Sequence, residues 1–117
     1  MRTLASSGAK LETFGGPAAQ TIVITGDAAC GYMAASKRAA QSVAQKNPSF
    51  AEFSVYTFDT RSDFKAWLGS TPDKADGRPT SGPALSHTTS PFIYFRDGAF
   101  IGGNDKFQEF IRSKGAL

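Results

Sequence analysis

The chain has 117 residues, ten phenylalanines and a formal net charge of +3, as expected for a single domain with one hydrophobic core. Its Lys and Arg residues are scattered, which argues against nucleic-acid binding, and no run reaches the roughly 18 apolar residues of a membrane-spanning helix. A single cysteine and a single histidine exclude an internal disulfide and a site that needs several Cys or His ligands from one chain.

The first 19 residues are expected to be an N-terminal extension to a domain at 20–117. They lack the apolar middle of a secretory signal, so a disordered or helical lead-in is expected, with the remnant of an organelle transit segment as the alternative. The free cysteine fits a reducing intracellular compartment, either cytoplasmic or organellar.

The first predicted unit is β-α-β. Residues 21–26 form a β-branched apolar run that ends in glycine, and residues 53–58 form a second strand. Between them, residues 32–46 show helical spacing, and the helix ends before Asn47 and Pro48. The two strands are therefore expected to be parallel. The helix face expected to be buried consists of Tyr32, Ala35, Ala39, Ala40 and Val43, with Ser36 tolerated among them.

The second half is expected to hold a short helix, a loop, a hairpin and a last helix. Thr60 or Asp59 can cap a helix that runs to Leu68. Residues 69–90 are rich in Gly, Pro, Ser and Asp and offer only Leu85 as an apolar anchor, so we expect a mobile surface loop that is dispensable for folding. A hairpin follows, with strands at 92–95 and 99–101 joined by an Asp-Gly turn. The last helix, 105–114, is expected to face inward with Phe107, Phe110 and Ile111.

Cys30 lies where the first strand gives way to the first helix, at the end of a sheet where α/β proteins place their sites. The free N–H groups of a helix's first turn favour a thiolate over a thiol. Taken alone, a lone cysteine is as readily a small buried hydrophobe. Pro91, which opens a strand, is compatible with a trans or a cis peptide bond. The pair Gly102-Gly103 lets a ligand approach, and Asp105 can simply cap the last helix.

Together these segments resemble the glutaredoxin family. The matching motifs are Cys-Gly-Tyr at 30–32, Thr-Ser-Pro at 89–91, Gly-Gly-Asn-Asp at 102–105 and Arg-Ser-Asp-Phe-Lys-Ala-Trp at 61–67. The resemblance covers about residues 20–114 without the loop 69–90. It implies an α/β thioredoxin-like fold, with a four-stranded mixed sheet and helices on both faces.

The resemblance also implies roles. Cys30 would be the catalytic nucleophile that carries a mixed disulfide with glutathione. The binding residues would be Tyr32 beside it, Ser90 pairing its backbone with the cysteinyl part next to a cis Pro91, Gly103, Asn104 and Asp105 at the γ-glutamyl end, and Arg61 at the glycine carboxylate. The expected function is glutathione-dependent thiol–disulfide exchange on glutathionylated or disulfide substrates, with one catalytic cysteine.

Departures from the family pattern keep two alternatives open. Met33 stands where many relatives have a second cysteine, and Asp27 stands where a lysine is usual. The glycine after Cys30 favours a [2Fe–2S] carrier, a homodimer in which each chain gives Cys30 and a bound glutathione. Asp27 and the long loop favour a non-catalytic binding module. His87 is expected to be a solvated loop histidine, with assistance to the thiolate as the alternative.

Overall fold

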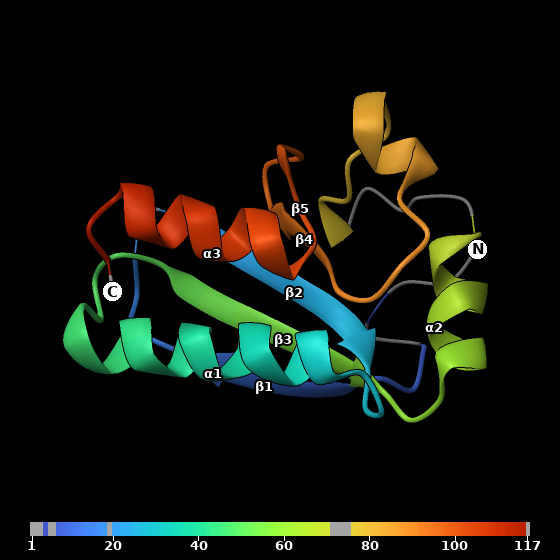
Figure 1. Cartoon of the computed structure of the whole chain (residues 1–117), viewed down its shortest axis with the longest axis horizontal. Helices are drawn as coiled ribbons and strands as arrows, with labels where there is room; N and C mark the ends of the chain where they lie inside the picture. Colours follow the sequence, from blue (N-terminus) through green and yellow to red (C-terminus); the bar gives the residue numbers. More distant parts are fainter. Residues whose placement is uncertain (1–3, 5–6, 19, 71–75, 117) are drawn as a thin grey trace.

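The computed structural model describes residues 4, 7–18, 20–70 and 76–116. Within them, five strands form one mixed sheet in the order β1-β3-β2-β4-β5. Helices cover both faces of this sheet (Figure 1). In chain order the elements are β1 (Lys10–Phe14), β2 (Thr21–Asp27), α1 (Gly31–Lys46), β3 (Glu52–Phe58), α2 (Arg61–Leu68), the 3-10 helix η2 (Gly82–Ser86), β4 (Phe92–Phe95), β5 (Phe100–Gly102) and α3 (Asn104–Ser113).

The centre of the sheet is the predicted β-α-β unit. β2 and β3 are parallel, in a register that pairs Ile24 with Val55, so the parallel pair and its connecting helix are confirmed. β2 is the middle strand, and its residues from Ile22 to Asp27 are buried. A strand covered on both faces needs the β-branched apolar run that marked it in the sequence.

The predicted hairpin completes the sheet. β4 pairs antiparallel with β2 and β5 antiparallel with β4. In the turn, the N–H of Gly98 donates to the carbonyl of Phe95 at 2.9 Å, and Gly98 adopts a φ of 101°, which glycine reaches without steric cost. The Asp-Gly turn is therefore confirmed, with β5 one residue later than expected.

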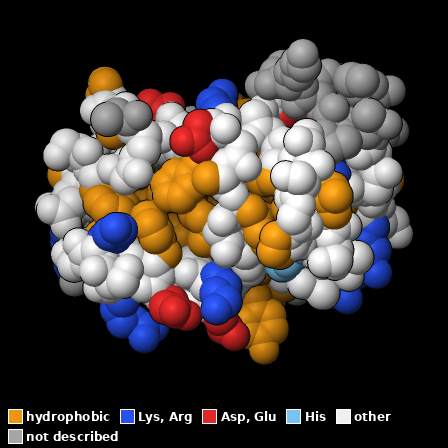
Figure 2. Space-filling view, turned by 90° about the horizontal axis from the view of Figure 1, so that it is seen from above, with side chains coloured by type: hydrophobic (Ala, Val, Ile, Leu, Met, Phe, Trp, Pro, Cys, Tyr) orange, Lys and Arg blue, Asp and Glu red, His pale blue; other side chains and the backbone are white. Residues whose placement is uncertain are grey.

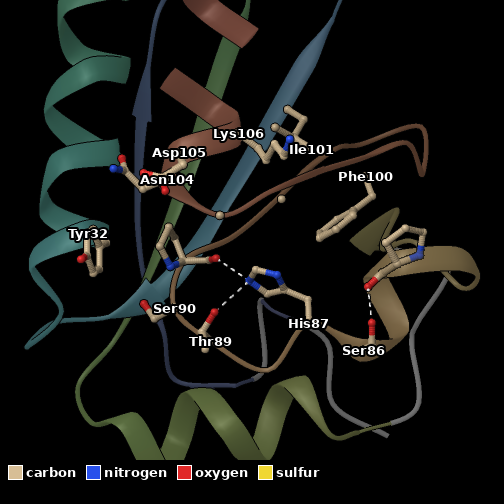
Figure 3. Close-up of a pocket in the computed structure, with 14 residues that line it drawn as sticks. Tyr32, Ser86, His87, Thr89, Ser90, Phe100, Ile101, Asn104, Asp105 and Lys106 are labelled. Carbon is tan, nitrogen blue, oxygen red and sulfur yellow. Dashed lines mark hydrogen bonds between the residues drawn. The ribbon is translucent and has the colours of Figure 1, made fainter. Parts of the chain in front are cut away.

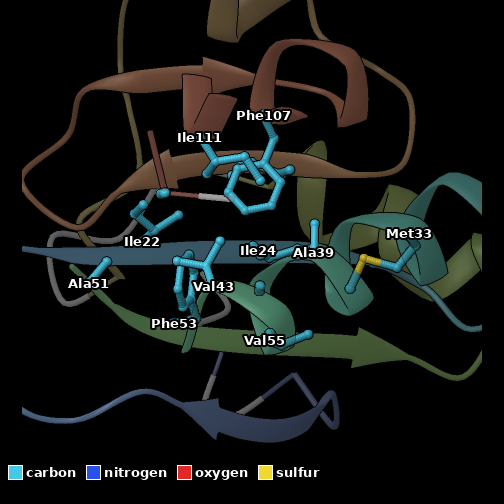
Figure 4. Close-up of a cluster of buried hydrophobic side chains, with 13 residues drawn as sticks. Ile22, Ile24, Met33, Ala39, Val43, Ala51, Phe53, Val55, Phe107 and Ile111 are labelled. Carbon is cyan, nitrogen blue, oxygen red and sulfur yellow. The ribbon is translucent and has the colours of Figure 1, made fainter. Parts of the chain in front are cut away.

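Two clusters of buried side chains hold the helices against the sheet. Even-numbered residues of β2, such as Ile24, face α1 and α3 (Figure 4), whereas Val23 faces α2. The first cluster includes Val43, Phe53, Phe107 and Ile111. The second is largely aromatic and consists of Phe58, Phe64, Trp67, Phe92 and Tyr94, with Leu4, Val23 and Ala84.

Two expectations about the first half are wrong. The N-terminal extension contains β1, an edge strand that pairs antiparallel with β3, so the sheet has five strands rather than four. Its Leu11 is 51% exposed, which explains why an alternating pattern was hard to see. On α1, Ala39, Ala40 and Val43 are buried as expected, but at the helix start Met33 packs against the core while Tyr32 is 65% exposed.

The loop 69–90 carries core residues, contrary to expectation. Leu85 is 66% exposed, while Asp76, Arg78 and Ala84 are buried. The guanidinium of Arg78 donates to the carbonyls of Trp67 and Leu68 at the end of α2 and stacks on the Trp67 ring with 4.4 Å to its centroid. Desolvation lowers the pKa of Arg78 from its ordinary value, against the opposing effects of Tyr94 and Asp76. Residues 71–75 lie outside the described part.

A second anchor joins this loop to the N-terminal segment. The backbone N–H of Leu4 donates to a carboxylate oxygen of Asp76 at 3.0 Å, and the Tyr94 hydroxyl donates to the Asp76 carbonyl at 3.0 Å. Three segments that are distant in sequence therefore meet at one residue.

Among the described residues, none of the helices has the length and hydrophobicity that a membrane-spanning helix requires.

Candidate functional site

Cys30 is the residue that precedes the first turn of α1. Its backbone is extended, with φ −86° and ψ 121°, and its carbonyl accepts the first helical hydrogen bond from Ala34 at 3.1 Å. The thiol is partly buried against the core under α1. The first N–H groups of this 16-residue helix have no partner within the helix and no side-chain cap.

The chain before β4 crosses directly beside this thiol. The Ser90–Pro91 peptide bond is cis, and the Cys30 sulfur lies 3.5 Å from the Ser90 carbonyl oxygen. The Ser90 hydroxyl accepts the N–H of Asp27 at 3.2 Å, so the ends of β2 and the start of β4 are fixed together. A Cβ on Gly26 would lie 2.4 Å from the Ser90 hydroxyl, which means that only glycine allows this approach.

One groove opens next to Ser90 and has a volume of about 700 Å³. We call it the first groove. Figure 3 shows Tyr32, Ser90, Asn104 and Asp105 on one side of it and His87, Phe100 and Ser86 on the other. The complete lining is Tyr32, Pro83, Ser86, His87, Thr89, Ser90, Pro91, Phe100, Ile101, Gly102, Gly103, Asn104, Asp105 and Lys106.

The α3 side of the first groove is held by hydrogen bonds from α1 and α3. The Asn104 side-chain oxygen accepts the Ser36 hydroxyl at 2.8 Å and the Gln108 amide at 3.3 Å. Gly103 precedes the helix without a side-chain cap, so the first N–H groups of α3 are open to a carboxylate from a ligand. Asp105 is exposed at the same end and offers an anion to an ammonium group.

A smaller groove of about 270 Å³ contains the thiol itself. We call it the second groove, and it shares Tyr32, Thr89 and Ser90 with the first. Its far side is α2, from which Arg61 and Lys65 enter one helical turn apart. The two grooves therefore meet at Ser90, with α3 N–H groups beyond one end and two cations at the other. The full lining is Cys30, Tyr32, Arg61, Phe64, Lys65, Thr88, Thr89 and Ser90.

A buried carboxylate lies behind the second groove. The side chain of Asp27 is 0% exposed, and its Oδ1 is 4.0 Å from Nε of Arg61, whose side chain is 66% exposed. Within the described residues, neither carboxylate oxygen has a hydrogen-bond partner. Arg61 therefore faces an anion of its own chain as well as the groove.

The expectation that His87 is a solvated loop residue is wrong. The ring is half-buried between Phe92 and Phe100, with 5.5 Å between ring centroids in both cases. Its Nε2 lies 2.9 Å from the Pro91 carbonyl oxygen, so the imidazole N–H donates to the backbone that carries the cis bond. His87 thereby joins the end of the loop 69–90 to the wall of the first groove.

The structure brings the predicted site residues into one continuous region. Cys30 and Arg61 line the second groove, Pro91, Gly103, Asn104 and Asp105 line the first, and Tyr32 and Ser90 line both. Sequence reasoning missed Lys65, Thr89, Phe100, Ile101 and Lys106. Lys65 carried a readable signal, because it follows Arg61 by four residues on a predicted helix. Phe100 and Ile101 were predicted only as part of the return strand of the hairpin, and both are half-buried.

The arrangement supplies a nucleophilic sulfur, backbone and helix N–H groups for an anion, and charged side chains at both ends. No group of three or more His, Cys, Asp or Glu in the described residues is placed to hold a metal ion. Comparisons with protein-family models, curated proteins and solved structures found no match to this chain.

Proposed function

We propose that this chain is a glutathione-dependent thiol–disulfide oxidoreductase of the monothiol glutaredoxin type, with a thioredoxin-like fold to which β1 adds an edge strand. The observation that carries the proposal is the placement of the Cys30 sulfur at a helix N-terminus, 3.5 Å from the Ser90 carbonyl oxygen and next to a cis Pro91. A thiol alone would be weak support. Here it lies in the second groove, in contact with Ser90, the residue at which the two grooves meet.

Glutathione fits the distribution of donors and charges along the two grooves. It is a short peptide with a carboxylate at each end and an ammonium at one, so it needs backbone pairing in its middle and charge partners at its ends. Ser90 would pair with the cysteinyl backbone. The first N–H groups of α3 would take the γ-glutamyl carboxylate, and Asp105 its ammonium. Arg61 and Lys65 are the cations for the glycine carboxylate.

The reaction needs only one protein sulfur. The Cys30 thiolate attacks the glutathionyl sulfur of a mixed disulfide, the S–S bond breaks, and the target leaves as a thiolate that takes a proton from water. A new disulfide then joins Cys30 to glutathione. A second glutathione thiolate attacks that glutathionyl sulfur, which releases oxidised glutathione and restores the Cys30 thiolate. The helix N-terminus stabilises this thiolate both as nucleophile and as leaving group.

The iron–sulfur alternative stays a prediction. Cys30 would supply one sulfur ligand per chain, so three ligands of a [2Fe–2S] cluster would come from bound glutathione and a second chain. Anaerobic expression with iron and glutathione tests it, because a bound cluster absorbs visible light and a chain without one does not. The binding-module alternative predicts a Cys30 that does not react.

Mass spectrometry after treatment with oxidised glutathione tests the proposal. We expect one added glutathionyl group, which reduced glutathione then removes. Asp105→Ala should slow both steps, because it removes the partner of the γ-glutamyl ammonium. Glu52→Ala, an acidic residue of β3 outside both grooves, is the matched control and should react as the unchanged chain does. A Cys30 that stays unmodified under conditions that modify free cysteine would leave only the binding-module interpretation.

A further inference from the structure

The first groove continues past the residues that glutathione would use. Gly103, Asn104 and Asp105 would hold the γ-glutamyl end, but the same groove is also lined by Pro83, Ser86, His87, Phe100 and Ile101. We call Pro83, Ser86 and His87 the loop wall, because all three come from the loop 69–90. Figure 3 shows His87 and Ser86 across the groove from Asn104 and Asp105. The loop thus creates space that a tripeptide would leave empty.

The loop wall has a fixed geometry. His87 donates from Nε2 to the Pro91 carbonyl at 2.9 Å, and its backbone N–H donates to the Ala84 carbonyl at 3.3 Å. Ala84 is buried in the aromatic cluster with Trp67 and Phe92, so η2 is tied to the core directly behind the wall. A preformed cavity of this kind binds without first ordering a segment, which is what ligand sites generally show.

The lining of this continuation is suited to an apolar side chain. Phe100 and Ile101 present partly exposed apolar surface, and Figure 2 shows apolar side chains gathered in the middle of the face that α3 and the hairpin form. The two residues of the groove with full charges, Asp105 and Lys106, have opposite signs. Lys106 also has Glu109 at 3.9 Å. The charges in this part of the first groove therefore favour neither an anionic nor a cationic group of a ligand.

At the other end of the site, the charges near Arg61 are also poorly suited to the terminal carboxylate of a free tripeptide. Arg61 is the cation expected at the glycine carboxylate, yet its Nε lies 4.0 Å from the buried carboxylate of Asp27. An anion so close offsets part of the attraction that Arg61 exerts on a second carboxylate. A polypeptide has no carboxylate directly after its cysteine, because the chain continues there, and it loses nothing from this arrangement.

We propose that the Cys30 site accepts disulfides of cysteine-containing polypeptides, with the residues before the reactive cysteine lying in the first groove and an aliphatic or aromatic side chain packed between the loop wall and Phe100. The direction follows from the proposed function, on which this inference rests: the γ-glutamyl residue precedes the cysteine of glutathione and points toward α3. The Cys30 thiolate attacks the polypeptide sulfur, the S–S bond breaks, and the second sulfur of that disulfide leaves as a thiolate. A glutathione thiolate then attacks the Cys30 sulfur of the new disulfide, so that the polypeptide leaves as a thiolate. A second glutathione thiolate attacks the glutathionyl sulfur on Cys30, which releases oxidised glutathione and restores the Cys30 thiolate.

Capped synthetic peptides test the direction and the side chain. The probes are the symmetric disulfides of acetyl-Leu-Phe-Cys-amide, acetyl-Cys-Leu-Phe-amide and acetyl-Gly-Gly-Cys-amide, and the readout is the rate at which Cys30 gains one peptide. We expect acetyl-Leu-Phe-Cys-amide to react about ten-fold faster than the other two, the effect expected from burying one large apolar side chain. Equal rates for the three peptides would overturn the inference.

Variants locate the effect in the loop wall. Ser86→Trp adds a large side chain at an exposed position that lines the groove, so it should remove the advantage of acetyl-Leu-Phe-Cys-amide without disturbing the core. Phe100→Ala should reduce the same advantage. Leu85→Ala, in the same loop but outside the first groove, should keep it. An advantage that survives both Ser86→Trp and Phe100→Ala would show that the peptide lies elsewhere.

Oxidised glutathione separates this inference from the proposed function. If it modifies Cys30 while all three peptides react at equal rates, the glutathione proposal stands and the polypeptide inference fails. If neither glutathione nor any peptide modifies Cys30, the proposed function itself fails. A faster reaction of acetyl-Leu-Phe-Cys-amide in the unchanged chain, lost in Ser86→Trp while modification by glutathione continues, supports both.

Discussion

On one side of the first groove, Gly103, Asn104 and Asp105 follow a hairpin and begin a helix of ten residues. On the other side, His87 lies near the end of the loop 69–90 and directly follows the short 3-10 helix η2. Strand register and helical hydrogen bonds fix the geometry of the first side. The loop wall is fixed instead by a few side chains that form hydrogen bonds with backbone groups. One site thus combines a wall set by topology with a wall set by single contacts, and single substitutions should affect the two walls differently.

The largest effect on adduct formation is expected at the Cys30 thiol. Cys30→Ser should abolish the glutathionyl adduct completely, because a hydroxyl does not take part in disulfide exchange. Stability should change little, since the sulfur is only partly buried. Mass spectrometry measures the first effect and urea unfolding the second. An adduct that persists in Cys30→Ser would contradict the assignment, as the chain has no other cysteine.

The loop wall should be far more sensitive to one distant side chain than the α3 wall. Arg78→Ala removes the donors to the Trp67 and Leu68 carbonyls and the stack on Trp67, so we expect a loss of about 3 kcal/mol in the free energy of unfolding. Arg78→Lys should recover only part, because an ammonium has no planar fork. Urea unfolding measures both, with Leu85→Ala as the control.

Leu85 is exposed in the same loop, so its replacement should change stability by no more than about 0.5 kcal/mol. If Arg78→Ala cost as little as Leu85→Ala, the loop would not depend on this contact, and the contrast between the two walls would be lost.

The pH dependence of the free energy of unfolding reports on Tyr94, which anchors the loop. Desolvation, followed by the nearby Asp76, raises the pKa of Tyr94 above its ordinary value of 10.0. Below that value both states keep the phenol neutral. Above it the unfolded chain ionises while the folded chain retains the proton, so the free energy of unfolding should fall by about 1.4 kcal/mol per pH unit. Urea unfolding from about pH 8 to about pH 11 measures this fall, given the ordinary tyrosine value.

Tyr94→Phe should be less stable by about 1 kcal/mol at neutral pH, because the bond to the Asp76 carbonyl is lost. Its stability should also decline less steeply above pH 10 than that of the unchanged chain. Tyr32→Phe, at a position 65% exposed, is the control. Parallel pH curves for the unchanged chain and Tyr94→Phe would mean that the phenol ionises without unfolding.

The smallest effect is expected at the buried carboxylate behind the second groove. Asp27→Asn removes the anion near Arg61, so the preference of Cys30 for glutathione disulfide over its glycine-amide analogue should rise a few-fold. The ratio of the two rates is the measurement, because it cancels any change in the reactivity of the thiol. An unchanged ratio would show that Asp27 does not govern the charge offered by Arg61.

The sequence predicted the α3 side of the first groove and missed the loop wall, for physical reasons. Local patterns predicted the strands at 21–26 and 53–58 and the Asp-Gly turn. These elements determine where Cys30, Ser90 and the start of α3 lie. β1 was missed because an edge strand with exposed residues has no buried run. Arg78 and Asp76 were missed because a charged residue in a polar loop is normally solvated, and their burial depends on partners far away in the chain.

The bond between the Leu4 N–H and Asp76 spans 72 positions. Removing the first nine residues would take away the backbone N–H that donates to the buried Asp76 carboxylate. It would also remove the Leu4 side chain, which belongs to the same buried cluster as Ala84 of η2. A preparation trimmed at its N-terminus should keep its helices and a reactive Cys30 while discriminating less among peptide disulfides. Where an affinity tag is attached thus becomes an experimental variable for substrate choice.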